Sequence, residues 1–186
     1  MMRVRMQIGN PLCDCTNGRL AVSFPHVMKA LHSILVAVLF VSIFPTQAAL
    51  RAGAEVVDAT PTVLPVNVNG GMRQRELDEV GSRIKVRAIV LDDGKTTLAI
   101  VVVDSCMMSR AFLDEAKAAA SNKTGIRVNR MFISATHTHS APASMGCLGT
   151  NVDPRYPLLL KRKIVEAIDG AKKNLEPAQV GAAVFD

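Results

Sequence analysis

The feature that most constrains the fold is an uninterrupted apolar run at residues 97–103, TLAIVVV. A run of this length, rich in β-branched residues, is typical of a central strand that is buried on both faces. Such a strand needs neighbouring strands and covering elements, so it predicts a layered domain. Hydrophobic residues make up 49% and charged residues 20% of the 186-residue chain, which fits a folded domain of this kind.

The segments around this run supply the other elements. Residues 92–95 (DDGK) form a turn signal that joins the run to an alternating apolar and charged segment before it. Residues 65–71 read as a loop, and residues 73–81 as a polar connection with a helical turn. Further strands are predicted at residues 51–59, 84–91, 128–135 and 180–185, and helices at residues 109–122 and 156–174.

The order of these elements predicts an α/β layered domain with a mixed β-sheet flanked by helices. The sequence ends directly after the last predicted strand, so we expect a domain that is truncated there.

The N-terminal region has the pattern of a signal peptide. Lys29 precedes an apolar run at residues 30–44, and small residues follow. The run is shorter than the roughly 20 apolar residues that a membrane-spanning helix needs. We expect residues 1–27 to be a gene-model extension, residues 28–48 to be a signal peptide, and residues 49–186 to be secreted or periplasmic. An uncleaved N-terminal membrane anchor is the alternative.

The composition argues against a nucleic-acid partner. The formal net charge is +6, but the basic residues are scattered outside two short clusters at 161–163 and 172–173. Aromatic residues are 4% of the chain, with no Trp, so a stacking surface for bases is not expected.

The candidate site is a pair of histidines, His137 and His139, just beyond the predicted strand at 128–135. The other two, His26 and His32, lie in or beside the apolar leader. In extended backbone, residues two apart face the same way, and imidazole is a common zinc ligand. The pair predicts half of a metal site; two surface-loop histidines without a ligand are the alternative. Asp104 is a candidate oxygen ligand, or a strand-end carboxylate that holds a loop.

The cysteines allow three interpretations. Cys13 and Cys15 precede the apolar leader, which leaves Cys106 and Cys147 in the body. Both are predicted near the same sheet edge, where an oxidising compartment would permit a disulfide. Two buried free thiols are the second interpretation. A thiol hydrolase with Cys106 as nucleophile is the third and least favoured.

Four segments resemble the N-terminal part of the neutral/alkaline non-lysosomal ceramidase family. The most specific is ISATHTHSAP at residues 133–142; the others are residues 51–61, 86–94 and 99–105. They follow the family's order and cover essentially all of the body. The resemblance implies a secreted or membrane-associated zinc amidase that cleaves the N-acyl bond of ceramide, or of a related lipid, to a sphingoid base and a fatty acid. It also implies that His137 is a Zn²⁺ ligand and that His139 lines the substrate pocket, both being catalytic.

The resemblance has two further implications. The family's remaining zinc ligands, a His, a Glu and a Tyr, lie far downstream of the motif, so we expect this chain to be an inactive fragment. Ala141 stands before Pro142 where the family commonly has Gly-Pro, and its methyl group is expected to narrow the wall of the site. A non-enzymatic exported module that binds a lipid or a protein is the alternative function.

Overall fold

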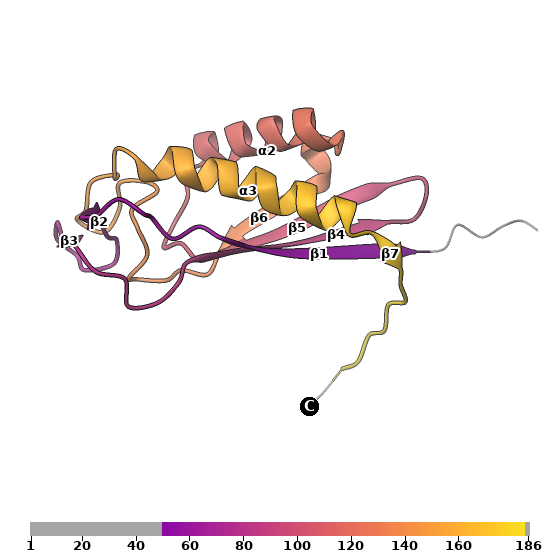
Figure 1. Ribbon diagram of the computed structural model, residues 1–186, viewed down its shortest axis with the longest axis horizontal. Coiled ribbons are helices and arrows are strands. Elements are labelled where there is room, and N and C mark those ends of the chain that lie inside the picture. The colour runs from indigo at the N-terminus through magenta and orange to yellow at the C-terminus, as the bar shows by residue number, and fades with distance from the viewer. Residues whose placement is uncertain (1–49, 185–186) are drawn as a thin grey trace, which may run out of the picture. The chain divides into compact units, whose positions relative to one another are not determined.

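A five-stranded mixed sheet with two helices on one face forms the part of the protein that the computed structural model describes, residues 50–184 (Figure 1). The predicted signal peptide, the preceding 27 residues and the leader's histidines and cysteines lie outside the described residues. The strands are β1 (Arg51–Asp58), β2 (Val66–Asn67), β3 (Glu76–Leu77), β4 (Lys85–Asp92), β5 (Thr97–Val103), β6 (Met131–Ala135) and β7 (Glu176–Pro177). The helices are α2 (Arg110–Thr124), α3 (Tyr156–Lys173) and the single 3₁₀ turn η1 (Val128–Arg130). The predicted α/β domain with a mixed sheet is therefore confirmed.

The strand order of the main sheet is β6-β5-β4-β1-β7. Antiparallel pairing joins β1, β4 and β5, whereas β5 and β6 are parallel and connected through α2. Parallel pairing places the carboxyl ends of two strands at the same edge. Val103 and Ala135, the last residues of β5 and β6, are register partners, so the loops that follow both strands begin side by side.

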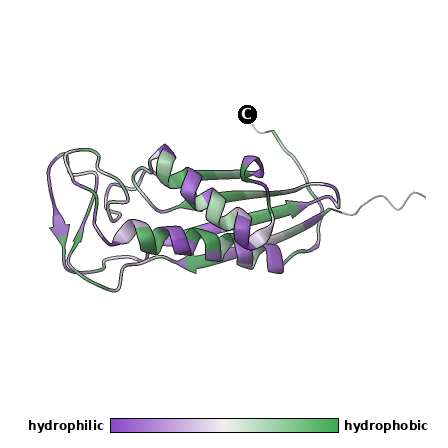
Figure 2. Cartoon of the chain, turned by 90° about the horizontal axis from the view of Figure 1, so that it is seen from above, coloured by the Kyte–Doolittle hydropathy of each residue, from purple (hydrophilic) through white to green (hydrophobic). Residues whose placement is uncertain are grey.

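The core lies between the sheet and the helical layer. Figure 2 shows α2 and α3 running over the strands. Alternate residues of β4 and β5 are buried, which places their side chains toward this helical layer. Among residues 50–184, no helix is both long enough and apolar enough to cross a membrane. The fully buried apolar side chains of this core include Val86, Val90, Val101, Val103, Leu160, Ile164 and Ile168.

The other face of the sheet is not covered by any described helix or strand. Ile89, Ile100 and Phe132 are register neighbours in one row across this face, and Phe132 is 63% exposed. Val56, in the next row, is also exposed. The prediction that residues 97–103 are buried on both faces was therefore wrong, because α2 and α3 both pack on the same side of β5.

Three smaller predictions were also wrong. Residues 180–184 form no strand, because the last ladder bond of the C-terminal segment runs from the Ala178 amide to the Leu50 carbonyl. The predicted strand at 128–135 begins only at Met131, since Arg130 closes a 3₁₀ turn onto Arg127. A small hairpin, β2–β3, replaces the helical turn predicted after residue 73, and its two-residue strands are too short to show alternation.

The α2 cap gives a first test of this fold. The Ser109 hydroxyl accepts a hydrogen bond from the Phe112 amide at 3.2 Å. Replacing Ser109 with alanine leaves that amide without a partner, so the free energy of unfolding should fall by about 1 kcal/mol. Urea unfolding measures the change. Ser121→Ala, within the same helix, is the matched control and should be neutral or slightly stabilising; equal losses in both variants would contradict the cap.

The turn between β4 and β5 gives a second test. The Thr97 hydroxyl, the Arg51 guanidinium and the Gly94 amide all donate to the Asp92 carboxylate, and they lower its pKa to about 2. Because the pKa of Asp92 is lower in the folded state, its carboxylate stabilises the fold at pH values above the ordinary aspartate pKa near 4. This stabilisation is lost as the pH falls from about 4 toward 2. In the parent protein, the urea concentration at the midpoint of unfolding should fall as the pH is lowered from about 4 toward 2. Asp92→Asn should make this fall shallower. Asp78→Asn, at an exposed loop position, should leave the decline as in the parent.

Candidate metal centre

The histidine loop begins where β6 ends and stays bonded to the loop after β5. The Thr136 amide donates to the Val103 carbonyl at 3.0 Å, and the Thr138 amide donates to the Ser105 carbonyl at 3.2 Å. The hydroxyls of Thr136 and Thr138 lie 2.7 Å apart and hydrogen bond to each other. These contacts carry the parallel pairing of β5 and β6 beyond the sheet and hold the histidine loop against residues 105–106.

His137 adopts a left-handed backbone conformation, with φ of 62°. This conformation is uncommon for residues other than glycine and marks a position held by its surroundings. The His137 Nδ1 atom lies 3.0 Å from the Cys106 carbonyl oxygen. Because a carbonyl can only accept, Nδ1 is the donor in this contact, and in the neutral imidazole Nε2 then carries the free lone pair. A metal-binding histidine is commonly oriented by such a bond from its second nitrogen.

His139 is positioned mainly through its backbone. Its carbonyl accepts from the Arg75 guanidinium at 2.9 Å, and Gly70 packs directly against its Cα and Cβ. The two imidazole rings meet edge to face, with their centroids 4.7 Å apart and their planes at 70°. Both histidines are exposed, so the pair forms an accessible cluster at the carboxyl edge of the sheet.

Cys106 completes this cluster. One ligand atom each from Cys106, His137 and His139 can be chosen so that all three lie within 4.8 Å of one another. Two imidazole nitrogens and a sulfur are donors that suit zinc and other thiophilic metals, so these residues fit a metal ion. Sequence reasoning placed Cys106 near the same edge as the histidines but did not count it as a metal ligand. The available signal was its position three residues after β5, the parallel neighbour of β6.

Asp104 does not belong to the cluster. Its carboxylate accepts from the Arg87 guanidinium and from the Lys85 amide, both at 2.9 Å. It therefore ties the end of β5 to β4, which is the loop-holding role rather than the role of an oxygen ligand.

The two body cysteines are free thiols; Cys106 is buried and Cys147 is partly buried. Burial raises the pKa of the Cys106 thiol, and the neighbouring Cys147 thiol raises it further. A catalytic cysteine needs the opposite shift, toward the thiolate. The structure thus shows the free-thiol interpretation rather than the disulfide, and it argues against a thiol hydrolase.

Ala141 bears on the shape of the site. It is fully buried and belongs to the hydrophobic core beneath the loop. Its methyl group therefore packs inward, and the expectation that it narrows the exposed wall of the site was wrong.

Comparisons with known proteins identify the fold. No protein-family model matches the chain. The neutral ceramidase of Pseudomonas aeruginosa superposes with a TM-score of 0.61 over 70% of this chain, at 21% sequence identity. A ceramidase complexed with C2 superposes with a TM-score of 0.57 over the same share, at 20% identity. The chain has the fold of part of a neutral ceramidase.

The predicted resemblance is thereby confirmed at the level of the fold. The chain spans 22% of the length of each ceramidase that it matches. The assignment of His137 to a metal and of His139 to a substrate stays a prediction.

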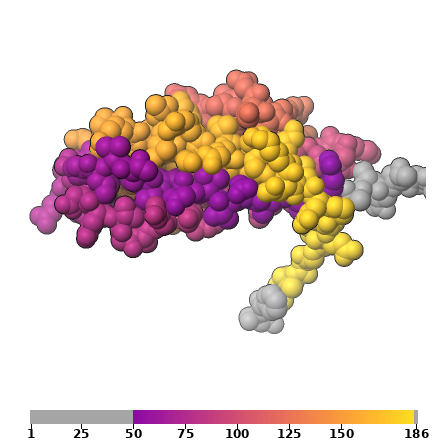
Figure 3. Space-filling view, viewed as in Figure 1, coloured from indigo at the N-terminus to yellow at the C-terminus, as the bar shows by residue number. Residues whose placement is uncertain are grey.

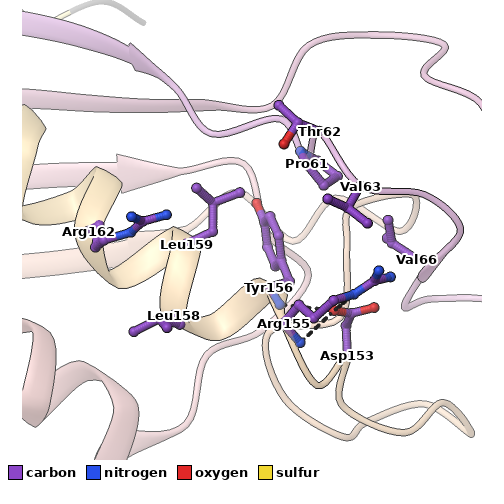
Figure 4. Close-up of a pocket in the computed structure, with 10 residues that line it drawn as sticks. All are labelled: Pro61, Thr62, Val63, Val66, Asp153, Arg155, Tyr156, Leu158, Leu159 and Arg162. Carbon is purple, nitrogen blue, oxygen red and sulfur yellow. Dashed lines mark hydrogen bonds and ion pairs between the residues drawn. The ribbon is translucent and has the colours of Figure 1, made fainter.

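Two cavities lie at the end of the sheet where segment 60–84 meets the loop after β6. Figure 3 shows the purple atoms of this segment packed beside orange atoms from later in the chain. One cavity, of about 220 Å³, has both apolar and polar walls and is lined by Ser140 and Pro142, next to His139. The other, of about 190 Å³, is shown in Figure 4; Tyr156 lines it, and Arg155 pairs with Asp153 at its rim. Neither cavity is lined by His137 or His139.

Tyr156 is a buried polar residue to which the sequence analysis gave no role. Its hydroxyl is buried and has no hydrogen-bond partner among the described residues. Burial raises the pKa of Tyr156, and the charges of Asp104 and Asp58 raise it further. Tyr156 is thus a neutral phenol that contributes to the core, and it lies outside the cluster of metal-ligating side chains.

Proposed function

We propose that this protein supplies His137 to the zinc site of an exported amidohydrolase of the ceramidase type. Its substrate is ceramide or a related lipid amide, hydrolysed to a sphingoid base and a fatty acid. The observation that carries the proposal is the His137 ring: its Nδ1 is fixed on the Cys106 carbonyl and its Nε2 is free, in a fold shared with ceramidases.

The chain's own residues would perform three tasks in this reaction. His137 would hold Zn²⁺ through Nε2, and the bound ion would supply Lewis-acid activation of water and of the amide carbonyl. His139, whose ring makes no hydrogen bond among the described residues, would face the substrate and bind its polar head. The Thr136–Thr138 hydroxyl pair would keep the loop rigid, since preorganised groups stabilise developing charge without reorganising.

The substrate class follows from the neighbourhood of the site. One ceramidase of similar fold is complexed with C2. In this chain, the apolar wall of the cavity beside Ser140, which includes Val66, Val68 and Leu77, could accommodate part of a hydrocarbon chain next to the histidines. A lipid substrate also requires contact with a membrane surface or micelle, and we propose this setting together with export from the cytoplasm.

The experiment is hydrolysis of a fluorescent N-acylsphingosine by the product of the gene, expressed through its natural stop codon. Release of the fatty acid should stop on chelation and return on addition of zinc. Hydrolysis that survives complete chelation would contradict a zinc mechanism, and a folded, zinc-loaded product without hydrolysis would contradict the amidase. Because the 186 residues span 22% of the ceramidases that they match, they are expected to be inactive by themselves. Hydrolysis by these residues that is lost on His137→Ala would contradict this expectation.

The alternative function, a non-enzymatic module that binds a lipid or a protein, has one observation in its favour. The face of the sheet that carries Ile89, Ile100 and Phe132 exposes apolar side chains. Contiguous exposed apolar surface is typical of an interaction site. The hydrolysis assay separates the two functions, because a binding module would release no fatty acid. Such a module would also bind its ligand equally well with and without zinc.

A further inference from the structure

We propose that Cys106 is a metal ligand in this protein, completing with His137 and His139 a site of two imidazole nitrogens and one thiolate sulfur. The inference rests on the metal site of the proposed function but not on its reaction. It departs from the assignment drawn from the ceramidase resemblance at two residues. There His137 is the metal ligand of the motif, His139 faces the substrate and no cysteine takes part, whereas here Cys106 and His139 are ligands as well.

The separations suit one shared ion. Around a tetrahedral zinc, a nitrogen and a sulfur ligand lie about 3.5 Å apart, given the usual Zn–N and Zn–S bond lengths. The three donor atoms here already lie within 4.8 Å of one another, without an ion. His139 is exposed and its ring makes no hydrogen bond among the described residues, so its rotation can shorten the remaining distance while His137 stays on the Cys106 carbonyl.

The Cys106 backbone is fixed in advance on both sides. Ser144 holds the two residues that flank Cys106 in the chain: its Oγ lies 3.0 Å from Ser105 Oγ and donates to the Met107 carbonyl at 2.7 Å. Cys106 itself accepts a hydrogen bond from His137 Nδ1 through its carbonyl. Cys106 would therefore both orient the His137 imidazole and present a sulfur to the same ion. A site held by such neighbours loses little entropy when the metal binds.

Charge and burial favour the same arrangement. Cys106 is the only member of the cluster that can become an anion, so its thiolate would offset part of the charge of a divalent ion. Cys106 is 1% exposed whereas the two histidines are exposed, which places the sulfur at the base of the site and the imidazoles at its rim. Three protein ligands with an open position toward solvent is the arrangement of catalytic rather than structural zinc sites.

Cobalt(II) is the probe, because a thiolate–cobalt bond gives a charge-transfer band in the near ultraviolet that nitrogen ligands do not give. The full 186-residue chain is used, with Cys13 and Cys15 replaced by serine so that only the body cysteines remain. The parent should show the band and bind cobalt, and Cys106→Ser should lose the band and bind at least about 10-fold more weakly. Cys147→Ser is the matched control and should keep both.

The outcomes decide between sulfur ligation and its absence. A parent without the band, a band that persists in Cys106→Ser, or a band lost only in Cys147→Ser would overturn the proposal. If Cys106→Ser does not fold, X-ray absorption of the zinc-loaded parent replaces it: a sulfur shell at about 2.3 Å supports the site and a shell of nitrogen and oxygen alone removes it. A sulfur signature without amide hydrolysis would remove the proposed reaction and leave this site, whereas hydrolysis without the signature would do the reverse.

Discussion

Replacing His137 with alanine is expected to abolish high-affinity metal binding by the chain and to lower zinc-dependent hydrolysis by the gene product about 1,000-fold. His137 is the imidazole that the structure fixes most firmly, through its left-handed backbone and the 3.0 Å contact of Nδ1 with the Cys106 carbonyl. An alanine removes the free Nε2, and no other described histidine can replace it. Isothermal titration with zinc and the N-acylsphingosine assay measure the two losses.

His139→Ala is the matched control, because it removes the other imidazole of the same loop. At saturating zinc, the substrate role proposed for His139 predicts that KM rises about 10-fold with kcat nearly unchanged. Zinc affinity should fall by a smaller factor than in His137→Ala. If the two variants lost hydrolysis and metal affinity equally, the division of roles between the histidines would be wrong.

Local sequence patterns were enough to predict the elements that build the site. The turn after β4, the Ser109 cap of α2 and the position of the histidines beyond β6 are all local patterns, and each occurs where it was predicted. The apolar run of β5 illustrates the limit of such patterns. Apolar residues at both alternate sets of positions indicate that both faces of the strand are hydrophobic, but they do not show what covers each face.

The metal cluster also shows where sequence patterns stop. The expectation that His137 and His139 face the same way assumed extended backbone, yet His137 is left-handed and the rings meet edge to face. Cys106 lies 31 residues from His137, and the contact between them exists because β5 and β6 pair in parallel with Val103 opposite Ala135. That register depends on the whole sheet and is not encoded in any short motif.

Replacing Gly70 with alanine is expected to lower the metal affinity of the chain about 10-fold or more while the sheet and helices stay folded. Gly70 has φ of 96°, a conformation that side chains rarely adopt, and a Cβ there would lie 2.4 Å from His139 Cβ and 2.5 Å from its Cα. The histidine loop must therefore move, and His139 moves with it. The strain should also cost about 1–3 kcal/mol of unfolding free energy.

Gly81→Ala is the matched control for this prediction, because a Cβ at Gly81 would have no atom within 4 Å. Cobalt titration and thermal unfolding of both variants separate the local effect from a global one. Gly70→Ala should retain the circular dichroism of the parent, since position 70 lies in a loop outside the hydrophobic core. Unchanged cobalt affinity in a folded Gly70→Ala variant would show that the placement of His139 does not matter to the site. A loss in both variants would point to general loop disruption, because only position 70 presses directly on His139.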